Sequence, residues 1–364
     1  MKKKIIYSIL SILILVTGCA KHSNQGIGIQ TGQYIFFDAD IALTKGGAIL
    51  GETLPADAGT AFGVFGYRAD GLPIFDLYTT SADAPLTSPV DYLAKVYRPS
   101  ASAAFTYDGL SIWKTGVHTF HAYYPYDSEV VMGEEDGDDD LYISYTQPEV
   151  LTDMVDYMTA YKSQSLTDGS NVELSFYHRL WALSLDVEFD QTSHPIDPES
   201  DPSLTIVSAE LQLKNIPETG LLAINQARSF NAGGDYMDLE YDLSPSTPIT
   251  LPYTVGENTI TSHSFGPMLF FPTDAVIDEN TKLQYRLELT FINSWGKEFS
   301  VSYPSEDESY ADFAPDATLE ANSAFEAGKH YKLKVTKSQG ESITVNFAFE
   351  DDGWEEKDIY HTFN

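Results

Sequence analysis

The segment Lys282-Leu-Gln-Tyr-Arg-Leu-Glu-Leu-Thr-Phe291 alternates apolar and polar side chains from Leu283 to its end. Successive side chains of a β-strand point to opposite faces of the sheet. One face of this segment therefore carries the five apolar residues Leu283, Tyr285, Leu287, Leu289 and Phe291. The segment predicts a half-buried strand of an antiparallel sheet, with one face on a core and the other in water.

Similar segments, separated by Gly, Pro, Asn and Asp, occur along most of the chain. Helical periodicity is scarce, and its best candidate is 148–161, which is short enough to be irregular instead. The shift of alternation at 178–181 predicts a bulge or bend within one long strand. These patterns favour an all-β fold of antiparallel β-sandwiches over βαβ units. Further strands are expected at 34–43, 61–67, 75–79, 96–97, 105–113, 117–124, 141–145, 172–189, 204–213, 269–271, 299–303, 330–335 and 342–349.

Charge and length restrict the class of protein. The chain has 364 residues, with 54 acidic and 21 basic side chains and a net charge of −33. Such a charge repels nucleic acid and anionic membrane surfaces. At roughly 100 to 200 residues per domain, the length predicts two domains. We place the boundary near Asp168, which gives an N-terminal domain over 33–168 and a C-terminal domain over 169–364. A second possible boundary is the acidic, proline-containing loop from Asp190 to Pro202.

The N-terminus has the features of a bacterial lipoprotein signal. Three lysines follow Met1, the stretch 5–16 is almost entirely apolar, and Val16-Thr17-Gly18-Cys19 ends it with small residues and the single cysteine of the chain. We expect residues 1–18 to be a signal peptide and 19–32 a tether that begins at a lipidated Cys19. The predicted location is the outer membrane, at the cell surface.

No motif indicates catalysis, a cofactor or a metal. The sequence contains no zinc-protease, nucleophile-elbow or phosphate-loop motif. His118 and His121 are three residues apart in an expected strand, so they face opposite sides, and His178 in an apolar segment is expected to be structural. The acidic run 134–140 is consistent with calcium binding or with a solvated hairpin tip, and its spacing does not match an EF-hand. We expect a protein that is not an enzyme.

The order of several motifs resembles the fimbrillin-like family, the pilus-subunit lipoproteins of Gram-negative anaerobes. These motifs are the lipoprotein signal, Phe62-Gly63-Val64-Phe65-Gly66-Tyr67, Phe120 to Pro125, Asp156-Tyr157-Met158, Val172 to Leu183, and the closing segment from Gly328 to Trp354. The resemblance implies two transthyretin-like antiparallel β-sandwich domains in tandem. It also implies a structural subunit of a fimbrium that binds other fimbrial subunits, with the lipid as its membrane contact and a possible tip role in binding a host or bacterial surface.

In that family a protease cuts behind the first strand, and a neighbouring subunit's strand fills the groove that opens. Here the resemblance maps the removable strand to Tyr34, Ile35, Phe36, Phe37, Ile41 and Leu43. Cleavage is expected between Lys45 and Gly46, where a plain surface loop is the alternative. The candidate donor strand contains Ile359, Tyr360 and Phe363, which could equally be a frayed terminus or the last strand of its own sheet.

A different class of function is also open. A monomeric surface lipoprotein that binds glycans would stack exposed aromatic rings on sugars. Four tryptophans are available for this, although alternating strands are expected to place most of them in sandwich cores. They are Trp113, Trp181, Trp295 and Trp354.

Overall fold

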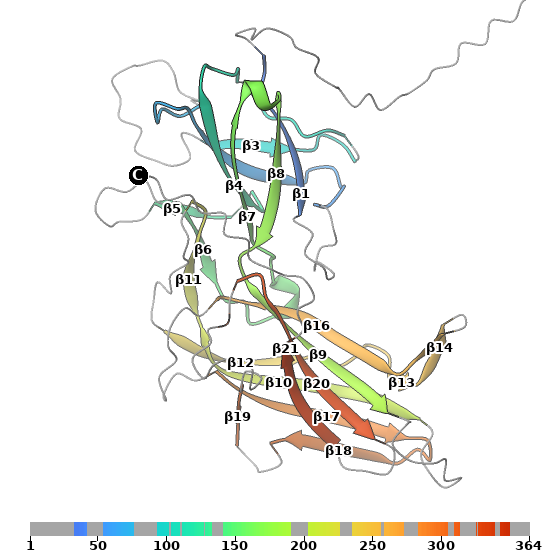
Figure 1. Cartoon of the computed structure of the whole chain (residues 1–364). Coiled ribbons are helices and arrows are strands. Elements are labelled where there is room, and N and C mark those ends of the chain that lie inside the picture. The colour runs from blue at the N-terminus through green and yellow to red at the C-terminus, as the bar shows by residue number, and fades with distance from the viewer. Residues whose placement is uncertain are drawn as a thin grey trace, which may run out of the picture.

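The computed structural model is an elongated, all-β molecule (Figure 1). It describes residues 33–41, 54–75, 93–101, 103–109, 111–126, 128–132, 141–190, 203–225, 235–255, 258–272, 283–304, 309–313, 325, 327–338 and 343–349. Across these residues the only helical elements are two 3₁₀ turns, η2 (Leu151–Asp153) and η3 (Leu166–Asp168). The predicted all-β class is confirmed. The helix considered at 148–161 is wrong, because only the 3₁₀ turn η2 is helical there and the last four residues belong to the strand Met158–Ser165.

The N-terminal half forms a six-stranded sheet. Its core lies on one face and contains Phe62, Val64, Phe120, Ala122 and Phe176, all fully buried. The other face carries Phe65 and Tyr123, and the absence of a side chain at Gly63 leaves room for the Tyr123 ring. The order of the strands is β1 (Phe36–Ile41), β8 (Asn171–His178), β7 (Met158–Ser165), β4 (Val117–Tyr124), β2 (Ala61–Tyr67) and β3 (Leu93–Tyr97).

One predicted strand of this half, 105–113, is wrong. In its described residues the segment makes only isolated bridges, at Thr106 and Ile112. Asp108 and Gly109, whose φ of +74° suits glycine, turn the chain instead. The aromatic residues that suggested a strand are still buried: Phe105, Tyr107 and Trp113 are at most 5% exposed. They fill the core face of the six-stranded sheet.

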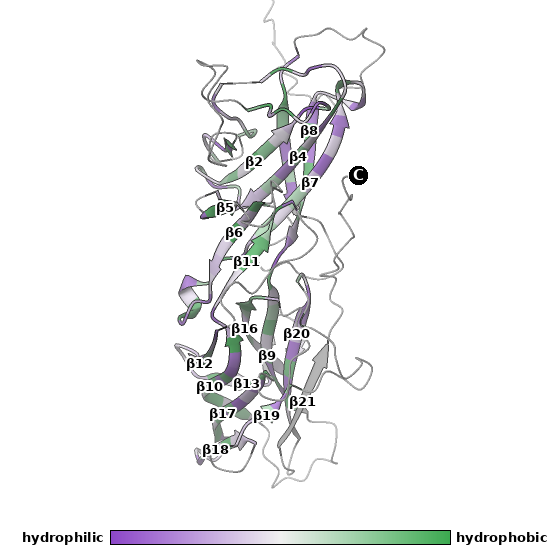
Figure 2. Ribbon diagram, turned by 90° about the vertical axis from the view of Figure 1, so that its left-hand side faces the viewer, coloured by the Kyte–Doolittle hydropathy of each residue, from purple (hydrophilic) through white to green (hydrophobic). Residues whose placement is uncertain are grey.

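The C-terminal half is a sandwich of two sheets, whose green apolar positions are visible in Figure 2. Leu287, Leu289 and Phe291 of β17 are at most 2% exposed and face the core between the sheets, which confirms the strand predicted there. The first sheet has the order β12 (Tyr236–Asp242), β10 (Leu204–Pro217), β17 (Gln284–Asn293) and β18 (Glu298–Tyr303), with β13 (Ile249–Leu251) on β10 and β19 (Ala311–Asp312) on β17. The second has the order β16 (Ser262–Phe270), β9 (Trp181–Asp190), β20 (His330–Ser338) and β21 (Ile343–Phe349).

A third sheet connects the two halves. It has the order β11 (Thr219–Ala223), β6 (Leu141–Thr146) and β5 (Val130–Met132), and a separate hairpin pairs β14 (Tyr253–Val255) with β15 (Asn258–Ile260). A third hydrophobic cluster joins residues of both halves, including Phe65, Tyr123, Ile143, Leu222 and Phe271. The two halves are therefore packed together through a shared core.

The segment 172–189 crosses from one half to the other. Residues up to His178 pair within the N-terminal sheet, and those from Trp181 pair with β16 and β20. The predicted bend is a change of sheet rather than a bulge. Asp168 lies in η3, between two strands of the same sheet. The domain boundary placed near it stays a prediction. The transthyretin-like topology also stays a prediction.

Candidate functional site at the first strand

The first described strand lies at an edge of the N-terminal sheet. β1 has β8 as its neighbour and runs parallel to it, from Phe36 opposite Asn171 to Ile41 opposite Phe176. Its side chains alternate: Ile35, Phe37 and Ala39 are at most 6% exposed. Tyr34 and Phe36, on the other face, are 49% and 41% exposed. The predicted first strand is thus part of the sheet.

Phe37 ties this edge strand to the core. Its ring packs against the rings of Phe75, Tyr107 and Phe120, with centroid distances of 6.0, 5.6 and 5.5 Å. Full burial of such a side chain contributes about 1.5–3 kcal/mol. Loss of β1 would expose this aromatic pocket to water.

Hydrogen bonds to the segment 107–113 hold the residues just before β1. The backbone N–H of Ile35 donates to the carbonyl of Ser111 at 2.9 Å, and that of Trp113 donates to the carbonyl of Gln33 at 2.8 Å. The Tyr107 hydroxyl donates to the Ile35 carbonyl at 3.0 Å. Burial raises the pKa of Tyr107 to about 12, so the phenol keeps its proton. Sequence reasoning missed this role, for which the cluster of aromatic residues at 105–113 was the available signal.

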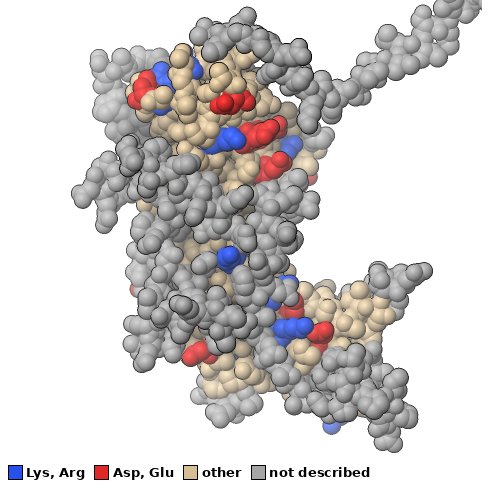
Figure 3. Space-filling view, in the orientation of Figure 1, with Lys and Arg blue, Asp and Glu red and all other residues tan. Residues whose placement is uncertain are grey.

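The outward face of β1 carries crowded carboxylates. Asp38 pairs in register with Glu173 of β8, and Asp40 lies two residues along on the same face. The pKa of Asp38 is raised, first by partial burial and then by Asp40 and Glu173, while Arg98 acts in the opposite direction. Figure 3 shows acidic side chains close together on this half of the molecule. Like charges opposite each other weaken strand pairing.

Several predicted site residues lie outside the described residues, so their roles stay predictions. Ile41 ends β1, but only its backbone is described. The others are Cys19, Leu43, Lys45 and Gly46 near the N-terminus, the acidic run 134–140, and Ile359, Tyr360 and Phe363 near the C-terminus.

The described histidines are packed rather than gathered into a site. His118 lies against Trp113, with ring centroids 5.0 Å apart, and His121 lies against Tyr161 at 4.9 Å, on the opposite face of β4 as predicted. Burial lowers the pKa of His121 to about 4, so its ring is neutral at physiological pH. Within the described part of the chain, no group of three or more His, Cys, Asp or Glu side chains could hold a metal ion.

His178 has the structural contact expected of it. Its Nδ1 lies 2.9 Å from both carboxylate oxygens of Asp156, and both side chains are buried. Since His178 ends β8 and Asp156 precedes β7, the contact lies where the chain leaves the N-terminal sheet. This pair fixes the start of the crossing between the two halves.

The tryptophans divide into two kinds. Trp113 and Trp181 are each 1% exposed, so neither can stack on a sugar. Trp295 is 65% exposed, and Trp354 lies outside the described residues. The glycan-binding alternative therefore loses two of its four candidate residues.

Comparison with known proteins identifies the family. The fimbrillin-like family model matches residues 55–351, whereas no curated protein matches the chain significantly. None of the described residues belongs to a helix that is long and apolar enough to span a membrane.

Solved structures resemble the chain at low identity. A proposed cell adhesion protein from Bacteroides uniformis is 15% identical, with a TM-score of 0.44 over 88% of this chain and 98% of that one. Another from Bacteroides ovatus is 14% identical, with a TM-score of 0.45 over 90% and 100%. The fimbrial anchor protein Mfa2 from Porphyromonas gingivalis is 12% identical, with a TM-score of 0.33 over 84% and 90%. Because the family match spans well over half of the chain, the protein belongs to the fimbrillin-like family, a family of structural cell-surface proteins rather than enzymes.

Proposed function

We propose that the protein is a fimbrial subunit that joins its neighbours by donor-strand exchange after β1 is cut away. The observation that carries the proposal is the position of β1, an edge strand that buries Ile35, Phe37 and Ala39. A strand with one sheet neighbour can leave without separating two others. The groove it leaves would expose an apolar floor to water, which is costly, and a row of backbone groups that is free to pair with another strand.

An incoming strand would restore both kinds of contact. Backbone hydrogen bonds to β8 would supply affinity, and alternate apolar side chains in the pocket of Phe37 would supply specificity. The segment with Ile359, Tyr360 and Phe363 is the candidate donor. Cys19 would hold the precursor on the outer membrane through its lipid until cleavage. A role at the fimbrial tip, in contact with a host or bacterial surface, is a further possibility within this proposal.

Cleavage between Lys45 and Gly46 tests the proposal. Native digestion of the full precursor with a trypsin-like protease should yield a chain that starts at Gly46 and forms ladders or long polymers. Lys45→Ala should yield no chain that starts at Gly46 and should not form these ladders or long polymers. Lys95→Ala is the matched control, because Lys95 is an exposed lysine of β3, at the opposite edge of the sheet from β1, and it should be cleaved and polymerise like the natural protein.

Mass spectrometry of the N-terminus and sedimentation velocity give the two readouts. A mature chain that still starts at Cys19, or a cleaved chain that stays monomeric and binds polysaccharide in a gel-shift assay, would contradict the proposal. The second result would favour the glycan-binding alternative.

A further inference from the structure

The turn between β17 and β18 presents an exposed aromatic side chain. Trp295 follows Asn293, the last residue of β17, and is 65% exposed. It has the highest exposed fraction among the exposed large apolar residues of the described chain. Exposed tryptophans on rigid supports are frequent anchors of protein interfaces.

Hydrogen bonds hold this turn in one conformation. The Asn293 side-chain oxygen accepts from the backbone N–H of Trp295 at 3.2 Å and from that of Lys297 at 2.8 Å. The Asn293 N–H donates to the Lys297 carbonyl at 3.0 Å, and the Gly296 N–H donates to the Asn293 carbonyl at 2.9 Å. Gly296 has a φ of +75°, which suits glycine. A preformed turn loses little conformational entropy on binding.

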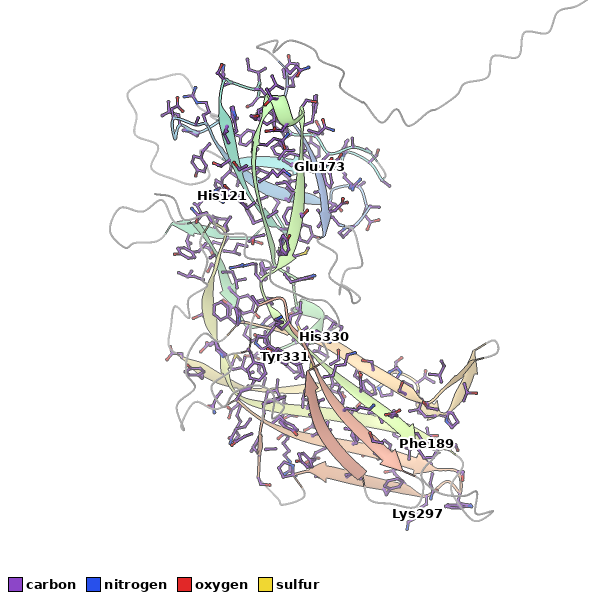
Figure 4. All side chains as sticks on the ribbon, viewed as in Figure 1. His121, Glu173, Phe189, Lys297, His330 and Tyr331 are labelled. Atoms are coloured by element: carbon purple, nitrogen blue, oxygen red, sulfur yellow. The ribbon has the colours of Figure 1, made fainter. Side chains whose placement is uncertain are left out.

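The Trp295 turn lies at the end of the C-terminal sandwich that is far from the N-terminal sheet. β9 enters this sandwich at Trp181 and runs away from the N-terminal sheet. Figure 4 places Phe189, near the far end of β9, at the same end as Lys297, whereas Glu173 lies in the other half. The Trp295 turn is therefore at one pole of the elongated molecule.

The opposite pole also exposes apolar side chains. β8 runs from Asn171 toward the C-terminal half. The turn η3, which precedes β8, therefore lies at the end of the N-terminal sheet that is far from the C-terminal half. Val117 pairs with Ser165 at that end and is 50% exposed. Leu72, 53% exposed, lies in the loop after β2. A Cβ on Gly116 would lie 3.0 Å from that of Ala69, so this loop packs beside the turn before Val117.

Charges at the two poles are complementary. The Trp295 turn carries exposed Lys297 and Glu298. Beside Leu72, Arg68 and Asp70 form a surface ion pair at 3.3 Å. Each pole therefore offers charges of both signs next to apolar surface, and Lys297 and Glu298 can pair with Asp70 and Arg68 of another copy.

We propose that the Trp295 turn docks on the patch formed by Leu72 and Val117 at the opposite pole of a second copy of this chain. A contact between two different surfaces of identical subunits repeats along a filament instead of closing a dimer. The inference rests on the proposed function, because it names a second contact between subunits joined by strand exchange. A protein partner fits better than a glycan, since small-molecule sites are concave with several converging polar groups, whereas this is a turn with one aromatic ring.

Sedimentation equilibrium of the uncleaved full chain tests the contact without strand exchange. Trp295→Ala should weaken self-association roughly 10- to 30-fold, the effect of losing a central anchor. Val117→Asp should weaken it similarly. Val150→Ala is the matched control, because Val150 is 53% exposed but lies between β6 and β7, away from both docking surfaces, and it should associate normally. Unchanged association of Trp295→Ala would overturn the inference.

Crosslinking tests the pairing of the two poles directly. In a Cys19→Ser background, copies with Ser294→Cys and copies with Ala69→Cys keep Trp295, Leu72 and Val117 and place the thiols on exposed neighbouring residues. They should form crosslinked pairs when mixed and not alone. Lys297→Glu should weaken association, and Asp70→Lys in the other copies should restore part of it. Crosslinks that form equally within each unmixed sample would contradict the pole-to-pole geometry.

The outcomes separate the two proposals. If cleaved protein fails to polymerise while the mixed crosslinks form, strand exchange is wrong and the docking contact stands. If cleaved Trp295→Ala forms polymers of natural length and stability, the docking contact is wrong and strand exchange stands. Loss of polysaccharide binding in Trp295→Ala, with unchanged self-association, would assign the turn to a glycan instead.

Discussion

β1 and β20 are both parallel to a neighbouring strand, yet their surroundings differ. β1 pairs with β8 at the edge of the N-terminal sheet. β20 lies inside its sheet, parallel to β9 on one side and antiparallel to β21 on the other. Both bury alternate side chains in a core, Phe37 in β1 and Leu333 in β20. Their positions in the sheets therefore predict that β1 opens more easily than β20.

The two strands should differ in the free energy needed to detach them. Detachment of β1 opens its backbone hydrogen bonds to β8 and the two that join residues 33–35 to Ser111 and Trp113, and it leaves β8 paired with β7. Detachment of β20 opens two lines and divides the sheet between β9 and β21. Local opening free energies vary within one protein, from near zero to the full unfolding free energy. We expect β1 to open locally and β20 to open only on global unfolding.

The largest expected effect is in β20. Leu333→Ala removes a fully buried side chain and should lower the free energy of global unfolding by about 2–5 kcal/mol. Lys334→Ala, at the next residue, should change it by less than about 1 kcal/mol, because its ion pair with Glu188 is partly exposed. Urea unfolding followed by tryptophan fluorescence measures both. Equal effects of the two variants would show that β20 is not a core strand.

In β1 the corresponding change should act locally. Phe37→Ala should raise amide exchange of residues 36–41 by about a hundredfold, since the lost burial amounts to ~3 kcal/mol. The unfolding midpoint should shift less than for Leu333→Ala, because detachment of β1 limits the loss. Phe36→Ala is the control, since its side chain points outward and is 41% exposed. A matching loss of global stability in Phe37→Ala would remove the contrast between the strands.

A smaller effect should come from the carboxylates. Glu173→Gln removes a like charge opposite Asp38 and should strengthen attachment of β1 by about 0.2–1 kcal/mol, seen as exchange up to about fivefold slower. Glu240→Gln, on β12, should leave β1 unchanged. The measurement is hydrogen exchange of the intact chain at neutral pH, and faster exchange in Glu173→Gln would contradict the repulsion.

Attachment of β1 should also depend on pH. The pKa of Asp38 in the folded chain lies above its ordinary value of 3.8, through burial, Asp40 and Glu173, against the opposing Arg98. The folded state thus binds the proton more tightly than the detached strand does. Attachment should be strongest below pH 3.8 and weaken as pH rises through the folded pKa. Asp38→Asn should flatten this dependence, and an undiminished slope in that variant would assign it to other groups.

Local patterns predicted strands well where side chains alternate beside a core. The bounds expected for 61–67 and 117–124 are those of β2 and β4. The strand predicted at 105–113 is wrong because its aromatic residues are buried by tertiary packing without strand pairing. At 178–181 a local shift of alternation could not distinguish a bulge from a change of sheet.

The candidate site was predictable only in part. Burial of Ile35 and Phe37 follows from their alternation with Tyr34 and Phe36. The parallel partner β8 is about 135 residues away in the sequence, and no local pattern encodes that choice. The same holds for the opposition of Asp38 and Glu173, which depends on the register between the two strands.

The buried amide of Gln147 has a mechanical consequence. Its side-chain oxygen accepts from the Tyr145 hydroxyl at 2.7 Å, and its nitrogen donates to the Leu269 carbonyl at 3.1 Å and to the Tyr241 hydroxyl at 3.4 Å. These groups come from three sheets, beside the point where β6 pairs with β11. Bending the molecule between its two halves would have to break these hydrogen bonds inside a dry interior, where each polar group left without a partner is costly. Under tension the subunit should therefore behave as a stiff rod, and the flexibility of a chain of such rods would come from the joints between them.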